Sequence, residues 1–134
     1  MVLDTNVLIY YLNQTLLPHG RTLINDAIKN GAFVSVISRI EILGWPGHSE
    51  ASLQDSAQFL LRNLEEYPLT EVIVDRCIAL RKEFSISLPD AIIAATARHL
   101  HLPLVTRNTD DFKSVTNLTL VNPFDLPPEN SESE

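Results

Sequence analysis

The chain opens with the stretch Met1-Val2-Leu3-Asp4-Thr5-Asn6, which runs directly into an apolar segment from Val7 to Leu12. This order predicts a short buried strand that ends at Asp4 and turns at once into a helix. In a parallel sheet, the segments that follow strands begin at the carboxyl edge, where open α/β folds bind their ligands. Asp4 is therefore expected at a ligand-binding edge, although its position also suits a simple helix N-cap.

Short apolar runs that are typical of strands alternate with amphipathic patterns along the chain. The strand-like runs cover residues 1–4, 32–36 and 103–106, with a weaker run at residues 118–121. Apolar stripes with helical spacing cover residues 23–28, 53–64, 73–84 and 91–100. The last of these is apolar on most sides, which predicts a central, buried helix. The alternation predicts an α/β fold in which a parallel sheet is flanked by crossover helices.

The composition fits one folded domain. The chain has 134 residues, of which 45% are hydrophobic, enough for a real core. No apolar run approaches the roughly 18 residues of a membrane span and no signal-like segment is present, so a cytoplasmic protein is expected. Cys77 is the only cysteine, and its apolar helical surroundings indicate a core thiol. We expect the domain to cover residues 1–124, followed by a disordered acidic tail over residues 125–134.

The net charge argues against a broad electrostatic grip on nucleic acid. The formal charge is −7, and four acidic residues without any basic one follow Phe124, so the folded part carries only about −3. A nuclease remains compatible with this charge, because a carboxylate site that holds a divalent metal inverts its own local charge.

Two further carboxylates stand at predicted helix starts. Ser38-Arg39-Ile40-Glu41 follows the second strand, and Ser87-Leu88-Pro89-Asp90 opens the apolar helix. Both segments match the capping box, in which Ser caps the first turn and the acidic residue reaches back to it. Glu41 and Asp90 therefore each have a structural explanation when they are considered singly.

The joint placement of the acidic residues points to a metal site. The stretch Thr106-Arg107-Asn108-Thr109-Asp110-Asp111-Phe112 follows the third strand directly. The carboxyl edge can thus collect Asp4, Glu41 and Asn108, with Asp111 nearby; Asp90 joins them if its helix begins at that edge. Carboxylates this close repel one another, and Mg²⁺ or Mn²⁺, which suit oxygen ligands, would relieve the repulsion.

Four segments, taken in order, carry a resemblance to a known family. They are Leu3-Asp4-Thr5-Asn6, Ser38-x-x-Glu41, Leu88-Pro89-Asp90-Ala91-x-Ile93-Ala94-Ala95-x-Ala97 and Thr106-x-Asn108-x-x-Asp111-Phe112. Their order and spacing resemble the PIN domain, and most of all the VapC-type toxins of bacterial and archaeal toxin–antitoxin pairs. The resemblance extends from Leu3 to about Phe124, nearly the whole chain.

This resemblance implies a PIN fold, with a short parallel sheet of four or five strands, and a metal-dependent endoribonuclease that hydrolyses RNA phosphodiester bonds with Mg²⁺ or Mn²⁺. The implied catalytic residues are Asp4, Glu41, Asp90 and Asp111. The implied metal ligands are Asp4, Asp90, Asn108 and Asp111. The candidate substrate contacts are Thr106, Arg107 and Asn6. A small cognate antitoxin and a toxin homodimer are the implied partners.

Two positions depart from the family pattern. Asn108 stands where an Asp is common, which lowers the charge of the site by one and leaves Asp111 to compensate. The few residues that usually precede the first strand are missing, so Met1 itself must serve in that strand.

Residues outside the motifs suggest a partner surface rather than chemistry. The N-terminal helices carry surplus apolar side chains that an amphipathic partner helix could cover, namely Tyr10, Tyr11, Leu16 and Leu17. The four histidines lie apart from the motifs and are not expected in the site: His19, His48, His99 and His101.

Two other functions stay open. A phosphoaspartyl phosphatase or a receiver domain also places Asp after its first strand, but it uses a Lys after a late strand, where this chain has Thr106-Arg107-Asn108. A PIN-like scaffold that binds RNA or a partner without cutting is favoured only by Asn108.

Overall fold

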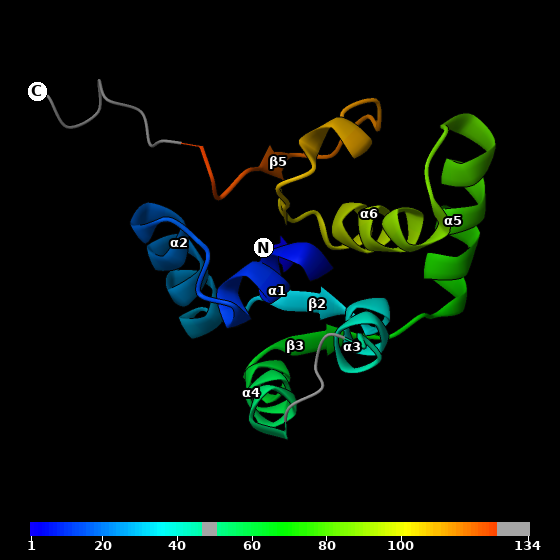
Figure 1. Ribbon diagram of the computed structural model, residues 1–134. Coiled ribbons are helices and arrows are strands. Elements are labelled where there is room, and N and C mark those ends of the chain that lie inside the picture. Colours follow the sequence, from blue (N-terminus) through cyan, green and yellow to red (C-terminus); the bar gives the residue numbers. More distant parts are fainter. Residues whose placement is uncertain (47–50, 126–134) are drawn as a thin grey trace, which may run out of the picture.

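The strands form one parallel sheet that lies between two layers of helices (Figure 1). The computed structural model describes residues 1–46 and 51–125. Five strands are ordered β3-β2-β1-β4-β5, and every neighbouring pair is parallel. Their bounds are Val2–Leu3 for β1, Phe33–Ser35 for β2, Glu65–Tyr67 for β3, Leu104–Val105 for β4 and Leu120–Val121 for β5. The predicted α/β fold with a short parallel sheet is confirmed.

The helices divide between the two faces of the sheet. One face is covered by α1 (Thr5–Leu12), α2 (Pro18–Lys29), α3 (Val36–Leu43) and α4 (Ala51–Arg62). The other face is covered by α5 (Glu71–Glu83) and α6 (Leu88–Leu100), and the short 3-10 helix η1 (Thr109–Asp111) follows β4. None of the helices in these described residues is long and apolar enough to cross a membrane.

Alternation along the strands explains why two cores form. Successive side chains of a strand point to opposite faces, so Val2 and Leu104 pack toward α5 and α6, whereas Leu3 and Val105 pack toward the other helices. Residues 91–97 of α6 are all buried, which confirms the predicted central helix. Cys77 is buried in the same core, and this burial raises the pKa of its thiol, as expected of an inert core cysteine.

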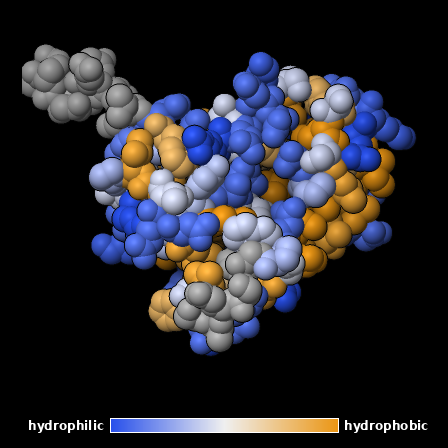
Figure 2. Space-filling view, viewed as in Figure 1, coloured by the Kyte–Doolittle hydropathy of each residue, from blue (hydrophilic) through white to orange (hydrophobic). Residues whose placement is uncertain are grey.

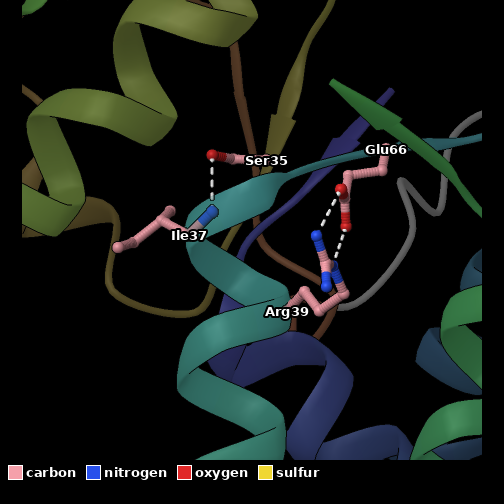
Figure 3. A network of polar contacts seen from close by, with 4 residues as sticks. All are labelled: Ser35, Ile37, Arg39 and Glu66. Carbon is pink, nitrogen blue, oxygen red and sulfur yellow. Dashed lines mark hydrogen bonds and ion pairs between the residues drawn. The ribbon is translucent and has the colours of Figure 1, made fainter. Parts of the chain in front are cut away.

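The edge strand β3 escaped prediction because its sequence, Glu65-Glu66-Tyr67, has neither an apolar run nor a clear alternation. In the sheet β3 pairs with β2 alone, and an arginine of α3 binds one of its glutamates. Arg39 donates from Nε to Glu66 Oε1 at 2.6 Å and from Nη2 to Oε2 at 3.1 Å, a bidentate pair shown in Figure 3. Charged side chains on an edge strand also discourage pairing with another chain.

Two of the three predicted helix caps are confirmed. Asp4 caps α1 and accepts a hydrogen bond from the Thr5 amide, and Ser87 caps α6 and accepts one from the Asp90 amide. The cap predicted at Ser38 is wrong. Helix α3 begins one turn earlier, because Ser35 at the end of β2 already accepts a hydrogen bond from the Ile37 amide (Figure 3).

The strand order creates a crevice between β1 and β4. From β1 the chain moves outward through β2 to β3, then crosses back to β4 on the far side of β1. Open α/β folds bind ligands at such a switch point, outside the carboxyl ends of the strands. Strand β1 begins at Val2 and not at Met1 as predicted, although the Met1 carbonyl accepts from the Phe33 amide at 2.9 Å. The tail predicted to be disordered covers residues 125–134, and all of it except Asp125 lies outside the described residues.

Candidate functional site

An open cleft of about 460 Å³ lies at the carboxyl edge of the sheet, and the predicted acidic residues line it. Its lining consists of Asp4, Thr5, Asn6, Ile9, Glu41, Gly44, Trp45, Pro46, Asp90, Asn108 and Asp111. The structure thus brings together all five predicted catalytic and metal-binding residues. Asp90 is among them because α6 begins at this edge of the sheet, which the sequence alone left open.

Asp4 lies deepest and is held on both carboxylate oxygens. Its Oδ1 accepts from the Thr5 amide at 2.8 Å, and its Oδ2 accepts from the Thr106 hydroxyl at 2.7 Å. The Thr106 hydroxyl in turn accepts from the Asn108 amide at 3.1 Å. This chain of hydrogen bonds joins the ends of neighbouring strands β1 and β4, so the carboxylate is fixed in one orientation.

Glu41 reaches the cleft from the body of α3 and is also positioned by a hydroxyl. Thr5 Oγ1 donates to Glu41 Oε1 at 2.6 Å and lies 2.8 Å from the hydroxyl oxygen of Ser38. Ser38 is fully buried, so the three residues form a polar link between α1 and α3. The role of Ser38 is therefore to support Glu41 rather than to cap a helix.

The last corner of the cleft comes from the segment after β4. Asn108 caps η1, and Asp111 ends it; both line the cleft. Asp110 lies outside the cleft lining and pairs with Lys113 at 3.5 Å on the exposed surface. This difference makes Asp111 the better candidate of the two neighbouring carboxylates.

The acidic groups are coupled electrostatically. Burial raises the pKa of Asp4 to about 6; the charges of Asp90 and Glu41 also raise it, while hydrogen bonds from Thr106 and Thr5 lower it. Burial is also the main cause that raises the pKa of Asp90. Asp111 and Glu41 raise the pKa of Asp90 further, and a hydrogen bond from the Ser87 side chain opposes them. Perturbed carboxyl groups gathered in one cleft are typical of functional sites.

The donor set fits a hard divalent cation with an incomplete protein shell. Within residues 1–46 and 51–125, no three His, Cys, Asp or Glu side chains converge closely enough to hold one ion by themselves. Mg²⁺ is usually bound by one or two carboxylates and keeps several waters. An open cleft lined by carboxylate and amide oxygens suits that mode, and Asp4, Asp90, Asn108 and Asp111 are the residues placed to supply ligands.

The predicted substrate contacts occupy three different environments. Asn6 lines the cleft, and its Oδ1 is buried without a hydrogen-bond partner among the described residues. Thr106 is fully buried beneath Asp4, which favours a positioning role for it. Arg107 lies outside the cleft lining; its guanidinium stacks 4.1 Å from the Phe124 ring centroid and donates to the Tyr10 hydroxyl at 3.1 Å.

The histidines behave as expected where the structure describes them. Neither His19, His99 nor His101 lines the cleft. His101 is the left-handed C-cap of α6, and His99 packs against Tyr67 at a centroid distance of 5.7 Å. His48 lies outside the described residues.

Some cleft residues were missed by sequence reasoning. Thr5 and Ser38 support Glu41 through contacts across 33 to 36 residues of sequence, which no local pattern reveals. The sequence pattern predicts Ser38 as a helix cap, whereas its hydroxyl contacts the hydroxyl of Thr5. Ile9, Trp45 and Pro46 add an apolar side to the cleft, and only the fold shows that they face it.

The PIN domain family model matches residues 1–118. The chain belongs to the PIN domain family. Solved structures agree with this assignment. A toxin–antitoxin complex from Klebsiella pneumoniae contains a chain 30% identical to this one, with 93% of this chain and 98% of that chain covered and a TM-score of 0.72. This family membership argues against the alternative of a phosphoaspartyl phosphatase or a receiver domain.

Further PIN-type neighbours show the same fold. VapBC2 from Rickettsia felis, solved bound to a DNA fragment from its promoter, is 25% identical over 90% of this chain and 96% of that chain, with a TM-score of 0.74. VapBC-1 from nontypeable Haemophilus influenzae is 21% identical over 92% and 98%, with a TM-score of 0.76. No curated protein sequence matched the chain. The predicted resemblance to VapC-type PIN domains is confirmed.

Proposed function

We propose that this PIN domain is a VapC-type toxin that hydrolyses RNA phosphodiester bonds with the help of Mg²⁺ or Mn²⁺. The observation that carries the proposal is the convergence of Asp4, Glu41, Asp90 and Asp111 on one cleft at the switch point of the sheet. Three of these carboxylates come from separate elements, β1–α1, α3 and α6, and the fourth from η1. Capping alone does not require these four carboxylates to converge in this way.

The protein residues divide the work by their positions. Asp4 is fixed by two hydrogen bonds, so it offers a preorganised ligand at the floor of the cleft. Glu41 keeps one carboxylate oxygen for Thr5 and can turn the other toward a water, which suits a general base or a water-orienting group. Asp90, Asn108 and Asp111 complete the oxygen lining. A bound divalent cation would activate water and neutralise the scissile phosphate.

The test is cleavage of total RNA by purified protein with and without Mg²⁺. Asp4→Asn and Asp90→Asn should each reduce cleavage to the level of a chelator control. The wild type should leave 5′-phosphate and 3′-hydroxyl ends, as expected when water attacks the phosphorus. Equal residual cleavage in wild type and both variants would indicate a contaminating nuclease and would refute the assignment.

A non-catalytic PIN scaffold is the remaining alternative, and Asn108 is the feature that favours it, because the amide reduces the charge of the site. Titration calorimetry with Mg²⁺ and Mn²⁺ separates the two functions. A nuclease should give a binding isotherm that Asp4→Asn abolishes, whereas a scaffold without a metal site should give no heat.

A groove in the α1–α4 helical layer, apart from the acidic cleft, supports an antitoxin partner. It measures about 610 Å³ between α1, α2 and α4, and its apolar lining includes Tyr11, Leu12, Ile28, Phe59 and Leu60. Phe59 is 67% exposed, which is unusual for so large an apolar side chain. An amphipathic helix of an antitoxin would bury these groups. Of the residues predicted for this surface, Leu16 is buried in the core instead.

A toxin homodimer is the other proposed assembly. Val72 and Ile78 of α5 are 46% and 49% exposed, and Leu69 just before that helix is 48% exposed. Figure 2 shows apolar residues gathered over the α5 side of the molecule. Light scattering on purified protein should give twice the chain mass of 15.0 kDa; a monomer at all concentrations would refute the dimer.

A further inference from the structure

The residue that follows the catalytic helix α3 is an exposed tryptophan at the edge of the acidic cleft. Gly44 ends α3 with near-helical angles, φ −89° and ψ 1°, and Trp45 comes next, its amide donating to the Ile42 carbonyl at 3.3 Å. Trp45 follows Glu41 by four residues and lies just beyond the end of the helix. Both line the cleft, and Trp45 is 38% exposed.

Trp45 belongs to an apolar wall of the cleft. Ile9 of α1 and Pro46 are the other apolar members, and these elements lie on the α1–α4 face of the sheet. Asp90 reaches the cleft from α6, on the other face. A ligand in the cleft therefore meets Asp90 from one layer, and both Glu41 and an aromatic ring from the other. That combination suits a nucleotide, with its charged phosphate and its flat apolar base.

The charges around the cleft show why such a ring is needed. No Lys or Arg is among the described residues that line it. Arg39 is paired with Glu66, and Arg107 is stacked on Phe124. Fixed positive charge therefore supplies little attraction for RNA here, and a bound cation would act only on the phosphate beside it. Stacking of a base on an aromatic side chain is worth roughly 5- to 150-fold in affinity, which is enough to hold a substrate.

We propose that Trp45 is the stacking platform for a nucleobase next to the scissile phosphate. Bases in a duplex are already stacked on their neighbours and cannot lie on a side chain unless they are splayed out. This inference rests on the proposed RNA-cleaving function and adds to it the residue that recognises the substrate.

The chain provides its own probe, because Trp45 is its only tryptophan. The wild-type protein with Mg²⁺ is mixed by stopped flow with a single-stranded RNA dodecamer, and indole fluorescence is read before product accumulates. The dodecamer should quench the fluorescence. An abasic ribose-phosphate oligomer of equal length should leave it unchanged, because it keeps the phosphates and lacks the bases. A duplex of the same sequence should quench only weakly.

Variants then measure the contribution of the ring to binding. Trp45→Leu should weaken binding of the dodecamer by roughly 5- to 150-fold by fluorescence anisotropy, and Trp45→Phe should restore most of it. Phe59→Leu is the matched control, since Phe59 is an exposed aromatic residue outside the cleft, and it should bind as the wild type does. Circular dichroism confirms folding, and the wild-type quenching keeps the test decisive if Trp45→Leu does not fold.

The outcomes separate this inference from the proposed function. Base-dependent quenching without any RNA cleavage supports the stacking platform and refutes the nuclease. Cleavage that is unchanged in Trp45→Leu, together with equal binding of dodecamer and abasic oligomer, refutes the platform and leaves the nuclease intact. Fluorescence that shifts with protein concentration and ignores RNA would mean that a second copy of the chain covers Trp45, which also refutes the platform.

Discussion

Replacing Asp4 with Asn should stabilise the metal-free protein, because burial of the ionised carboxylate destabilises the folded state. Its pKa is raised from 3.8 to about 6, chiefly by burial. A difference of about 2 pKa units corresponds to about 3 kcal/mol between the protonation states. Between pH 4 and 6 the folded state keeps Asp4 protonated, whereas the unfolded state has released the proton. The free energy of unfolding of the wild type therefore falls by about 3 kcal/mol as the pH rises through that window, and it stays lower at higher pH.

The Asn side chain avoids the charge and keeps most of the hydrogen bonding. Its oxygen can accept from the Thr5 amide, and its NH₂ group can donate to the Thr106 hydroxyl. The one hydrogen bond lost is that in which the Thr106 hydroxyl donates to Asp4. We subtract about 1 kcal/mol for that loss. Asp4→Asn should therefore raise the free energy of unfolding by about 2 kcal/mol at pH 8, and the gain should vanish between about pH 4 and 5, where the pKa effect falls to the size of the lost hydrogen bond.

The assay is urea unfolding in EDTA from pH 4 to pH 8, with the difference between variant and wild type as the measured quantity. Asp110→Asn is the control, because the Asp110 side chain is 89% exposed and should change stability by less than about 0.5 kcal/mol. Mg²⁺ should then stabilise the wild type and not Asp4→Asn. An Asp4→Asn protein that is less stable than wild type at pH 8, or a difference that does not narrow toward pH 4, would refute the reasoning.

Three further predictions concern the surroundings of the cleft. Asp111→Asn should reduce RNA cleavage by on the order of 10- to 100-fold, whereas Asp110→Asn should not; equal rates in the two variants would remove Asp111 from the site. Thr5→Val should lower the cleavage rate by a similar factor, because Glu41 loses its hydroxyl partner, and Thr5→Ser should recover the rate. Arg107→Leu should cost about 1 kcal/mol in urea unfolding, because its stack on two aromatic rings is lost, and should leave the salt slope of RNA binding unchanged. A smaller salt slope would instead restore Arg107 as a phosphate contact.

The sequence predicts the fold well where hydrophobic patterns are strong. The runs around Val2, Val34 and Leu104 are short and mostly apolar, so the sequence is sufficient to predict their strands. Strand β3 could not, because Glu65-Glu66-Tyr67 owes its conformation to pairing with β2 and to the ion pair with Arg39, both of which are contacts distant in sequence. Local patterns carry no record of such contacts.

The candidate site, too, can be predicted from the sequence only where local patterns determine it. Asp4, Glu41 and Asp90 can be identified because the sequence places each at a predicted helix start, and crossover topology sends helix starts to the carboxyl edge. Glu41 lies in the body of α3 instead, but its helix still brings it to that edge. The exact cap of α3 was wrong because Ser35 and Ser38 are both good capping residues, and the end of β2 decides between them. The apolar wall with Trp45 was not predicted as part of the site, since an exposed aromatic residue gives no sign of which surface it faces.

Capping does not explain why an acid occupies the position after β1. Ser35 and Ser87 cap α3 and α6 of the same chain with neutral hydroxyl groups, and a Ser or Asn at an N-cap stabilises a helix as well as Asp does. At Asp4 the acid adds burial of a charge and repulsion from Asp90 and Glu41, which together raise its pKa. A neutral residue at position 4 would cap α1 equally well and would destabilise the fold less. The negative charge of Asp4 is therefore explained by a role in the cleft and not by capping. The stability gained in Asp4→Asn and the loss of Mg²⁺ binding are therefore two measurements of the same property.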